Sequence, residues 1–539
     1  MIIKKGNLLI LLGIILLGTL LRLMYFQHIT FGYDQARDAL QSISILKDMH
    51  PKIIGPTTDI RGLFHSPLYW YIVSPFYFFS GGNPAIARIP MIFINILNIV
   101  FIYFFAKKLF NNEKIALLCS LFMSVSFEAV QYARWLSNPP PAILTSAIFF
   151  YGLWLVLKNK PIGLPLMIFI WGFSVDFQFF LLYHIVFILF AFVYLFFTNK
   201  DTIISSFRKY YLLYVFSFLP WIFYIASEIK FKFQGLTSLL GFFTKKEESG
   251  FYLIPKLFTF INSLIKNIYV NLLGTRAEFS QIQQITAYMI LFIIIVYPFY
   301  KIFVNKKNST LMLFLLAWLF SPVFIYPIEK NHSYFLNIGN IYPLIIIVVY
   351  IINDIGNSFS KKTGKIFIAF MMTLLVVINI NFILKDNKNG ETLFSVQNRQ
   401  DLFDEKKVMD YIYKDNKTRD YAINTVTNPL LMNTTWAYLF NWYGKSKYGY
   451  MPHWVGYPLD SFGKEIQFSD EKWSQNSKNF YLIIEPKPGI PDDYIDAYIK
   501  YENTRSIILE TKKIGTFTVE KRRFINNNHF LRTELDEML

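Results

Sequence analysis

Three charged residues, Asp34, Arg37 and Asp38, lie close together just after the first long apolar stretch of the chain. If this segment is helical, their spacing of i, i+3 and i+4 places them on one face. A carboxylate can serve as a general base, typically for about 10²–10⁴-fold in rate, and polar groups placed beside lipid are costly and tend to be functional. The alternative is an interfacial helix with a surface ion pair, which would contribute little free energy.

Two further motifs follow in the same segment. Residues 62–71 read Gly-Leu-Phe-His-Ser-Pro-Leu-Tyr-Trp-Tyr, and residues 81–90 read Gly-Gly-Asn-Pro-Ala-Ile-Ala-Arg-Ile-Pro. Taken alone, the aromatic residues 69–71 are typical of a belt at the level of the lipid headgroups. A single histidine such as His65 is, by itself, more often structural than chemical.

The composition indicates that membrane-spanning helices must position these motifs. Of the 539 residues 54% are hydrophobic and only 17% are charged, and the apolar residues occur in long runs. Soluble domains carry about a quarter charged residues. The net charge of +17 is spread over short clusters between the apolar runs, which argues against a nucleic-acid-binding patch and is typical of cytoplasmic loops. The single cysteine, Cys119, excludes an intramolecular disulfide and a cysteine-based metal site.

Eleven apolar segments are predicted to be transmembrane helices, because a span needs about 20 apolar residues. Residues 67–79 are interpreted instead as an interfacial segment, and residues 162–197 as two helices with a turn near Asp176 and Gln178. The first helix, residues 8–26, is expected to be an uncleaved span. The predicted spans begin near Leu8, Ile89, Ile115, Ala142, Ile162, Phe179, Tyr210, Ile285, Leu311, Ile341 and Ile366.

The distribution of lysine and arginine predicts the orientation. With the N terminus in the cytoplasm, most of these residues fall on inner turns, whereas the short outer turns carry only Arg134 and Lys330. We therefore expect a multi-pass protein of the cytoplasmic (plasma) membrane. Its transmembrane domain would comprise residues 1–386, with two long outer loops at 27–88 and 228–284.

Residues 387–539 are predicted to form an extracytoplasmic α/β domain, because charges of both signs become frequent there. Its aromatic stretch at 436–450 favours packing, with carbohydrate stacking as the alternative. The expected elements are a helix at 401–413, strands at 421–426 and 480–485, and a hairpin at 506–519 around Gly515 that ends in the charged run 520–523.

The order of the motifs resembles that of the GT-C membrane glycosyltransferases. It is most similar to the branch of the protein O-mannosyltransferases and aminoarabinose transferases (glycosyltransferase family 39). That branch has an acidic motif after the first helix, matched by residues 33–39, then a proline–aromatic motif, matched by 66–71, and an Ala-Arg-Leu-Pro-like motif, matched by 87–90. Beyond the first hundred residues or so the resemblance is one of topology.

The resemblance implies an inverting transfer of a sugar from a polyprenyl-phosphate donor to an acceptor hydroxyl on the outer face of the membrane. Asp34 would be the general base. Positive or polar groups would bind the donor phosphate or position the base; the candidates are Arg37, His65, Arg88, Arg134 and His332. The substrate groove would be lined by Tyr33, Tyr69, Trp70 and Tyr334.

The chain departs from the pattern of these relatives at three positions. Gln35 stands where they often have a second carboxylate, so no cofactor is implied and a divalent metal would lack paired acids. His65 stands where the aminoarabinose transferases have a lysine, and Asn138 stands where an acid is frequent.

Other functions remain open at this stage. A flippase or transporter for lipid-linked saccharides would place charged residues in mid-membrane. A polysaccharide polymerase or ligase would rely on arginines in a large outer loop, and a receptor or scaffold would use the C-terminal domain. The sugar is not specified, and the acceptor could be a glycan, a lipid or a protein.

Overall fold

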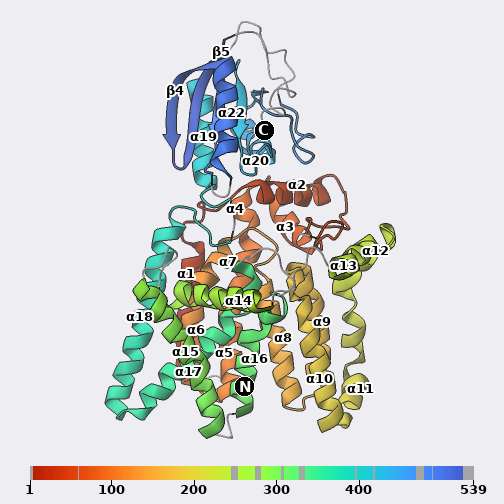
Figure 1. Cartoon of the computed structure of the whole chain (residues 1–539), viewed down its shortest axis with the longest axis vertical. Helices are drawn as coiled ribbons and strands as arrows, with labels where there is room; N and C mark the ends of the chain where they lie inside the picture. Colours follow the sequence, from red (N-terminus) through yellow and green to blue (C-terminus); the bar gives the residue numbers. More distant parts are fainter. Residues whose placement is uncertain are drawn as a thin grey trace.

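The computed structural model has two parts, a bundle of long helices and a smaller α/β domain at one end of it (Figure 1). It describes residues 4–58, 60–244, 253–273, 281–304, 309–326, 334–394, 397–416, 419–468, 479–487 and 490–525.

An apolar helical segment occurs at each of the eleven predicted spans. Within the described residues, seven helices are long and apolar enough to cross a membrane, and the pair α6–α7, bent by 51°, makes an eighth. Three further apolar helices are shorter than 18 residues. The seven are α1 (Lys5–Leu23), α4–α5 (Pro84–Ala87 and Ile89–Phe110), η1–α10 (Phe179–His184 and Ile185–Thr198), α11–α12 (Lys200–Phe216 and Ile222–Lys230), α15 (Gln281–Val304), α17 (Ile341–Ser358) and α18 (Lys361–Asn387). The bent pair is α6 (Glu113–Val125) with α7 (Phe127–Arg134), and the shorter ones are α8 (Ala142–Leu157), α9 (Gly163–Phe177) and α16 (Ser309–Phe320) with its extension η5 (Ser321–Phe324).

Helix α17 lies at the centre of the bundle. In the apolar stretch of α17, 72% of the residues are buried. In that of α11–α12, which lies at the periphery, only 11% are buried. The break between α9 and η1 falls at Gln178, as predicted, so residues 162–197 form two helices rather than one.

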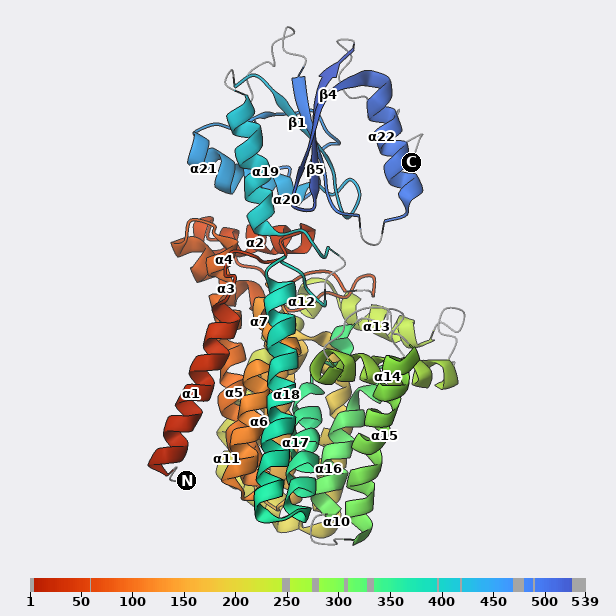
Figure 2. The same cartoon turned by 90° about the vertical axis from the view of Figure 1, so that its left-hand side faces the viewer.

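The end of the bundle away from the α/β domain carries basic residues. Helix α1 begins at the end away from the α/β domain, and the lysine-bearing turn from α17 to α18 lies at that same end (Figure 2). This arrangement agrees with the predicted succession of spans, which places the N terminus and this turn on the same side of the membrane. Which end faces the cytoplasm stays a prediction.

The segment after α1 covers the opposite end of the bundle. It folds into α2 (Tyr33–Lys47), a short antiparallel pairing of residues 55–58 with 63–65, and α3 (Leu68–Phe79) before α4. Gly62 has φ +90°, a left-handed conformation that glycine adopts at low cost. The second predicted outer loop contains α13 (Gln234–Thr244), α14 (Leu253–Ile268) and a π-helical turn (Tyr269–Leu273), and α14 lies across the bundle (Figure 1).

The C-terminal part is a five-stranded mixed sheet with strand order β2-β1-β3-β5-β4. Strand β1 (Ala422–Val426) pairs in parallel with β2 (His453–Trp454) and β3 (Asn479–Ile484), and β5 (Phe517–Phe524) pairs antiparallel with β3 and β4 (Ser506–Ile514). Helices α19 (Leu402–Asp415) and α22 (Asp492–Arg505) cover opposite faces of this sheet (Figure 2).

Alternation along the strands explains why both faces are covered. Successive side chains of a strand point to opposite faces. Ile423, Tyr481 and Val519 pack into one core, which includes α19, whereas Phe480 and Leu482 pack into a second core with α22.

The predicted hairpin exists, and its second strand includes the charged run 520–523 in which it was expected to end. Strand β5 continues to Phe524, because the charges of the run 520–523 are paired within the domain. Arg522 is fully buried and contacts Glu520 at 2.5 Å, and Lys521 contacts Asp415 at 2.6 Å. Neither α22 nor the short strand β2 was predicted from the sequence.

Candidate functional site

The start of α2 holds the predicted base. Gly32 precedes the helix, and its N–H donates to Oε1 of Gln35 at 3.0 Å, so that Gln35 caps the helix from within. This use gives a physical reason for the amide at a position where relatives often carry a second acid. Asp34 lies in the first turn, where the partial positive charge of a helix N terminus stabilises a carboxylate.

Arg37 is held between two carboxylates. Its Nη1 donates to Asp34 Oδ1 at 2.8 Å, while its Nε and Nη2 both donate to Asp38 Oδ1 at 3.0 and 2.9 Å. Asp38 is buried, whereas the Asp34 side chain is 48% exposed. The predicted i, i+3, i+4 face therefore exists, with Asp38 as the buried anchor and Asp34 at the accessible end.

Burial raises the pKa of Asp38 above its usual value, as does the nearby charge of Asp34, while Arg37 and Trp70 act in the opposite direction. Arg37 keeps its positive charge, because the two carboxylates raise its pKa more than burial lowers it. The site thus presents one fixed guanidinium and one accessible carboxylate.

His65 lies beside Arg37. Burial, with a smaller contribution from the Arg37 charge, lowers the pKa of His65 to about 4, so the imidazole is neutral at neutral pH. Its Nδ1 is buried and has no hydrogen-bond partner among the described residues. His65 is therefore suited to hydrogen bonding a ligand but supplies no positive charge at pH 7.

A pocket of about 370 Å³ brings these residues together. Asp34, Arg37 and His65 form its polar side, and aromatic rings from α7–α8, η1 and the η6 turn (Tyr334–Asn337) form much of the rest. Those rings and polar neighbours are Trp135, Phe179, Phe180, Phe335, Phe394, Asn138 and Gln178. The combination of a charged rim and an aromatic wall suits a ligand with a polar head and an apolar tail.

The predicted groove residues divide between surface and core. Tyr33 is half-buried, lies 5.8 Å from the Arg37 guanidinium, and lines an adjoining pocket of about 400 Å³ together with Trp70. Trp70 is itself mostly buried, and Tyr69 is fully buried beneath α2. Tyr69 is thus placed to support α2 rather than to contact a ligand in this pocket.

Arg88 and Arg134 do not line the Asp34 pocket. Arg134 donates to the carbonyl oxygens of Met24 at 2.7 Å and of Asn387 at 3.0 Å, and also to that of His28. These contacts satisfy carbonyl groups at the end of α1 and join them to the end of α18. Arg88 is fully buried at the start of α5 and donates to the carbonyl of Phe26 at 3.1 Å.

The remaining predicted residues come from the last outer turn. His332 lies outside the described residues. Tyr334 begins the η6 turn, whose neighbouring residue Phe335 lines the Asp34 pocket. The same short turn therefore borders the pocket.

Several pocket residues were not predicted from the sequence. Trp135 and Phe394 pack with ring centroids 5.0 Å apart although they are far apart in the chain. The sequence signal for Trp135 was its position beside Arg134 at an outer turn. Nothing local in the sequence marks Phe394, because it follows the last span in a polar stretch.

No group of three or more His, Cys, Asp or Glu side chains in the described part of the chain is arranged to hold a metal ion.

Comparisons with known proteins complement this geometry. The sequence profile of the dolichyl-phosphate-mannose-protein mannosyltransferase family matches residues 64–224. The structure of ArnT from Cupriavidus metallidurans, both apo and bound to undecaprenyl phosphate, matches with a TM-score of 0.52 and 11% identity, covering 96% of this chain and 98% of ArnT. The apo oligosaccharyltransferase of Archaeoglobus fulgidus has a TM-score of 0.48 and 13% identity, covering 89% of this chain and 69% of that one. A search of curated protein sequences finds no match.

The ArnT likeness establishes the fold, and the family match covers the segment from the His65 motif to α12. Together they confirm the predicted resemblance to the GT-C glycosyltransferases. The chain has the architecture of a polytopic GT-C membrane protein, and residues 64–224 are similar to the mannosyltransferase family.

Proposed function

We propose that this protein is an inverting glycosyltransferase that moves a sugar from a polyprenyl-phosphate donor to an acceptor hydroxyl. The observation that carries the proposal is the pocket in which an accessible carboxylate, Asp34, lies 2.8 Å from the anchored guanidinium of Arg37. The ArnT structure with bound undecaprenyl phosphate supports a polyprenyl-phosphate partner. The reaction would take place at the end of the bundle that bears the α/β domain, on the outer face of the membrane.

The proposed step is a single displacement at the anomeric carbon. Asp34 accepts the proton of the acceptor hydroxyl, whose oxygen forms a bond to that carbon from the side opposite the phosphate. The bond between the anomeric carbon and the phosphate oxygen breaks, and the polyprenyl phosphate leaves with the bonding electron pair. A phosphate leaving group needs no proton, but its charge is stabilised by a cation in a site with little water, which is the role of Arg37.

The aromatic wall would hold the first part of the polyprenyl chain. Trp135 contacts the rings of Phe394 and Phe335, and these three side chains line the same pocket as Arg37. A lipid phosphate bound there would place its headgroup at the charged rim and its tail against the rings. His65 would contribute a neutral hydrogen bond to the headgroup.

The test is to incubate the purified protein, reconstituted in nanodiscs, with a panel of polyprenyl-phosphate sugars and to measure the release of polyprenyl phosphate. We expect Asp34→Asn to lower the rate of transfer by about 10²–10⁴-fold, the usual contribution of a general base. Asp496→Asn is the matched control, because Asp496 is exposed on α22, away from the pocket.

Three results would contradict the proposal. Transfer by Asp34→Asn at the wild-type rate would show that Asp34 is not the base. Donor that reaches the opposite leaflet with its sugar–phosphate bond intact would instead indicate a flippase, and a product ladder of growing glycans on the lipid would indicate a polymerase.

A further inference from the structure

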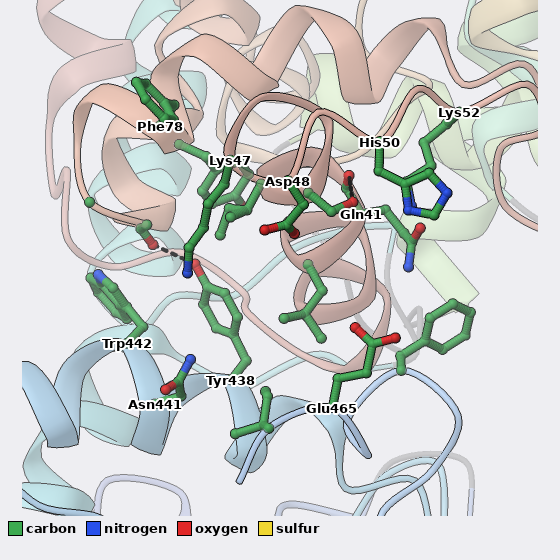
Figure 3. Close-up of a pocket in the computed structure, with 18 of the residues that line it drawn as sticks. Gln41, Lys47, Asp48, His50, Lys52, Phe78, Tyr438, Asn441, Trp442 and Glu465 are labelled. Carbon is green, nitrogen blue, oxygen red and sulfur yellow. Dashed lines mark hydrogen bonds between the residues drawn. The ribbon is translucent and has the colours of Figure 1, made fainter.

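A larger cavity separates the segment after α1 from the C-terminal domain. It has a volume of about 700 Å³, and its two walls come from different parts of the chain (Figure 3). Gln41, Lys47 and Asp48 project from α2 and its end on one side. On the other side lie Tyr438 of α20 (Thr434–Leu439) and Asn441 and Trp442 of the π-helical turn η7 (Phe440–Gly444), as well as Glu465.

This cavity and the site that contains Asp34 both adjoin a third pocket, with which each shares lining residues. Gln41, His50 and Lys52 line both the large cavity and the pocket of about 400 Å³ next to it. That pocket in turn shares Arg37 and Pro56 with the Asp34 pocket. We call these three adjoining spaces the trough; its lining residues extend from Trp442 to the Asp34–Arg37 pair.

Trp442 is presented to the trough in a fixed position. Its ring stacks on that of Tyr438 with a centroid distance of 6.1 Å and an interplanar angle of 24°, and the Tyr438 hydroxyl donates to the carbonyl of Gly82. Gly82 has φ +92°, and a Cβ at this position would lie 2.9 Å from Cδ1 of Trp442. A glycine is therefore needed where the chain passes the indole, which itself stays only half-buried.

The polar groups of the large cavity suit an uncharged ligand with many hydroxyl groups. The side-chain amides of Gln41 and Asn441 make no hydrogen bond with the described residues, and each offers both a donor and an acceptor. The charges are balanced, with Lys47 and Lys52 offset by Asp48 and Glu465. An aromatic face beside such polar groups can stack on the apolar face of a sugar ring while the hydroxyl groups are hydrogen bonded.

We propose that this trough binds the acceptor, and that the acceptor is a neutral glycan. The inference rests on the proposed glycosyl transfer and names its second substrate. A volume of about 700 Å³ lies within the range of about 300–1,000 Å³ for ligand pockets and is more than one sugar ring fills. One end of the glycan stacks on Trp442, and its acceptor hydroxyl reaches the Asp34–Arg37 pair at the other end of the trough.

Balanced charge distinguishes this acceptor from an anionic lipid headgroup. A site for a phosphorylated headgroup would carry an excess of Lys or Arg, because charge complementarity favours the matching partner. An extended peptide would add to an exposed strand edge, whereas the residues that line the large cavity belong to helices, helical turns and loops and none of them to a strand.

The first test measures binding without any donor. Full-length protein in nanodiscs is titrated with trisaccharides of glucose, mannose and N-acetylglucosamine, and saturation-transfer difference NMR reports contact with the sugar protons. We expect at least one trisaccharide to bind, and Trp442→Ala and Asn441→Ala each to weaken this binding about tenfold or more, as loss of a stacking or hydrogen-bonding group would do. Tyr494→Ala is the control, because Tyr494 is an exposed aromatic residue on α22.

Absence of binding by every trisaccharide, or equal binding by wild type and both variants, would overturn the proposal. So would a Ser/Thr-rich peptide or glycerol phosphate that binds in place of the sugars and depends on Trp442. Because Asn441 is exposed, the Asn441→Ala variant retains the fold and keeps the test valid if Trp442→Ala does not fold.

The second test separates this proposal from the proposed function. With a donor and the trisaccharide that binds, Trp442→Ala should raise KM for the acceptor about tenfold, consistent with the loss of one stacked ring, whereas the control Tyr494→Ala should leave this KM unchanged. If the donor is cleaved but KM for the acceptor does not change, the glycan site is wrong and the transferase stands. If glycans bind but no donor is cleaved, the transferase is wrong.

Discussion

Replacement of Asp38 tests whether the buried carboxylate acts through Arg37. Asp38 lies one helical turn from Asp34 and lines neither the Asp34 pocket nor the adjoining one, so its effect must be one of position. Both of its bonds to Arg37, from Nε at 3.0 Å and from Nη2 at 2.9 Å, end on a single oxygen, Oδ1. Asp38→Asn can keep an oxygen at this place and Asp38→Ala cannot.

The magnitude follows from these two bonds. Asp38→Asn keeps the two hydrogen bonds from the charged guanidinium but removes the opposite charge at their acceptor. We expect it to lose about 1.5–3 kcal/mol in total, on the order of one hydrogen bond to a charged group. Asp38→Ala removes one partner of a buried pair, which costs about 3–5 kcal/mol. If this free energy holds Arg37 in its catalytic position, kcat/KM falls at least about tenfold in Asp38→Asn and about 10²–10³-fold or more in Asp38→Ala.

The assay is the steady-state release of polyprenyl phosphate by purified variants whose folding is checked by thermal unfolding. A double-mutant cycle with Arg37→Ala isolates the coupling, because Asp38→Asn should have little further effect once Arg37 is absent. Wild-type kcat/KM in a folded Asp38→Ala protein would refute the reasoning. So would equal effects of Asp38→Asn in the presence and absence of Arg37.

Two further predictions concern stability. Burial lowers the pKa of His65 from 6.5 to about 4, so the unfolded chain binds a proton at this residue more readily than the folded protein does. The contribution of His65 to the unfolding free energy is therefore fully present above pH 6.5. It falls by up to about 3 kcal/mol as the pH drops toward 4. Thermal unfolding of His65→Gln between pH 7 and 4.5 should show a shallower fall than wild type, and an unchanged pH dependence would contradict the burial of a neutral imidazole. Arg134→Leu should lower the unfolding free energy by more than about 3 kcal/mol, because several charge-assisted bonds to carbonyl oxygens at the ends of α1 and α18 are lost; an unchanged Tm would show that these bonds are dispensable.

The helical bundle and the start of α2 could be predicted because their signals are local. Apolar runs mark the spans wherever they lie in the chain, and the spacing of Asp34, Arg37 and Asp38 determines their common face once the segment is helical. The three hydrogen bonds among these residues join partners that are at most three positions apart in the sequence. Such features require no knowledge of the tertiary structure.

The rest of the site depends on contacts between distant segments. Arg134 was a candidate to bind the donor phosphate or to position the base, because of its place at an outer turn. Its guanidinium lies against carbonyl oxygens at the ends of α1 and α18, and no local pattern in the sequence indicates these partners. Phe394 reaches the aromatic wall only because the chain turns back after α18. The trough likewise joins Trp442 to residues some four hundred positions earlier.

The pairing that docks the C-terminal domain has a consequence for how the protein is made. The N–H of Phe31 donates to the carbonyl of Gln400 at 2.8 Å, and the N–H of Leu402 donates to that of Ile29 at 3.0 Å. The segment around residue 30 is synthesised early and can form these hydrogen bonds only after the segment around residue 400 has been synthesised. All the spans can enter the membrane before residue 400 leaves the ribosome, yet one wall of the trough does not exist until then. A chain that stops after α18 would therefore be inserted and still have no complete acceptor site.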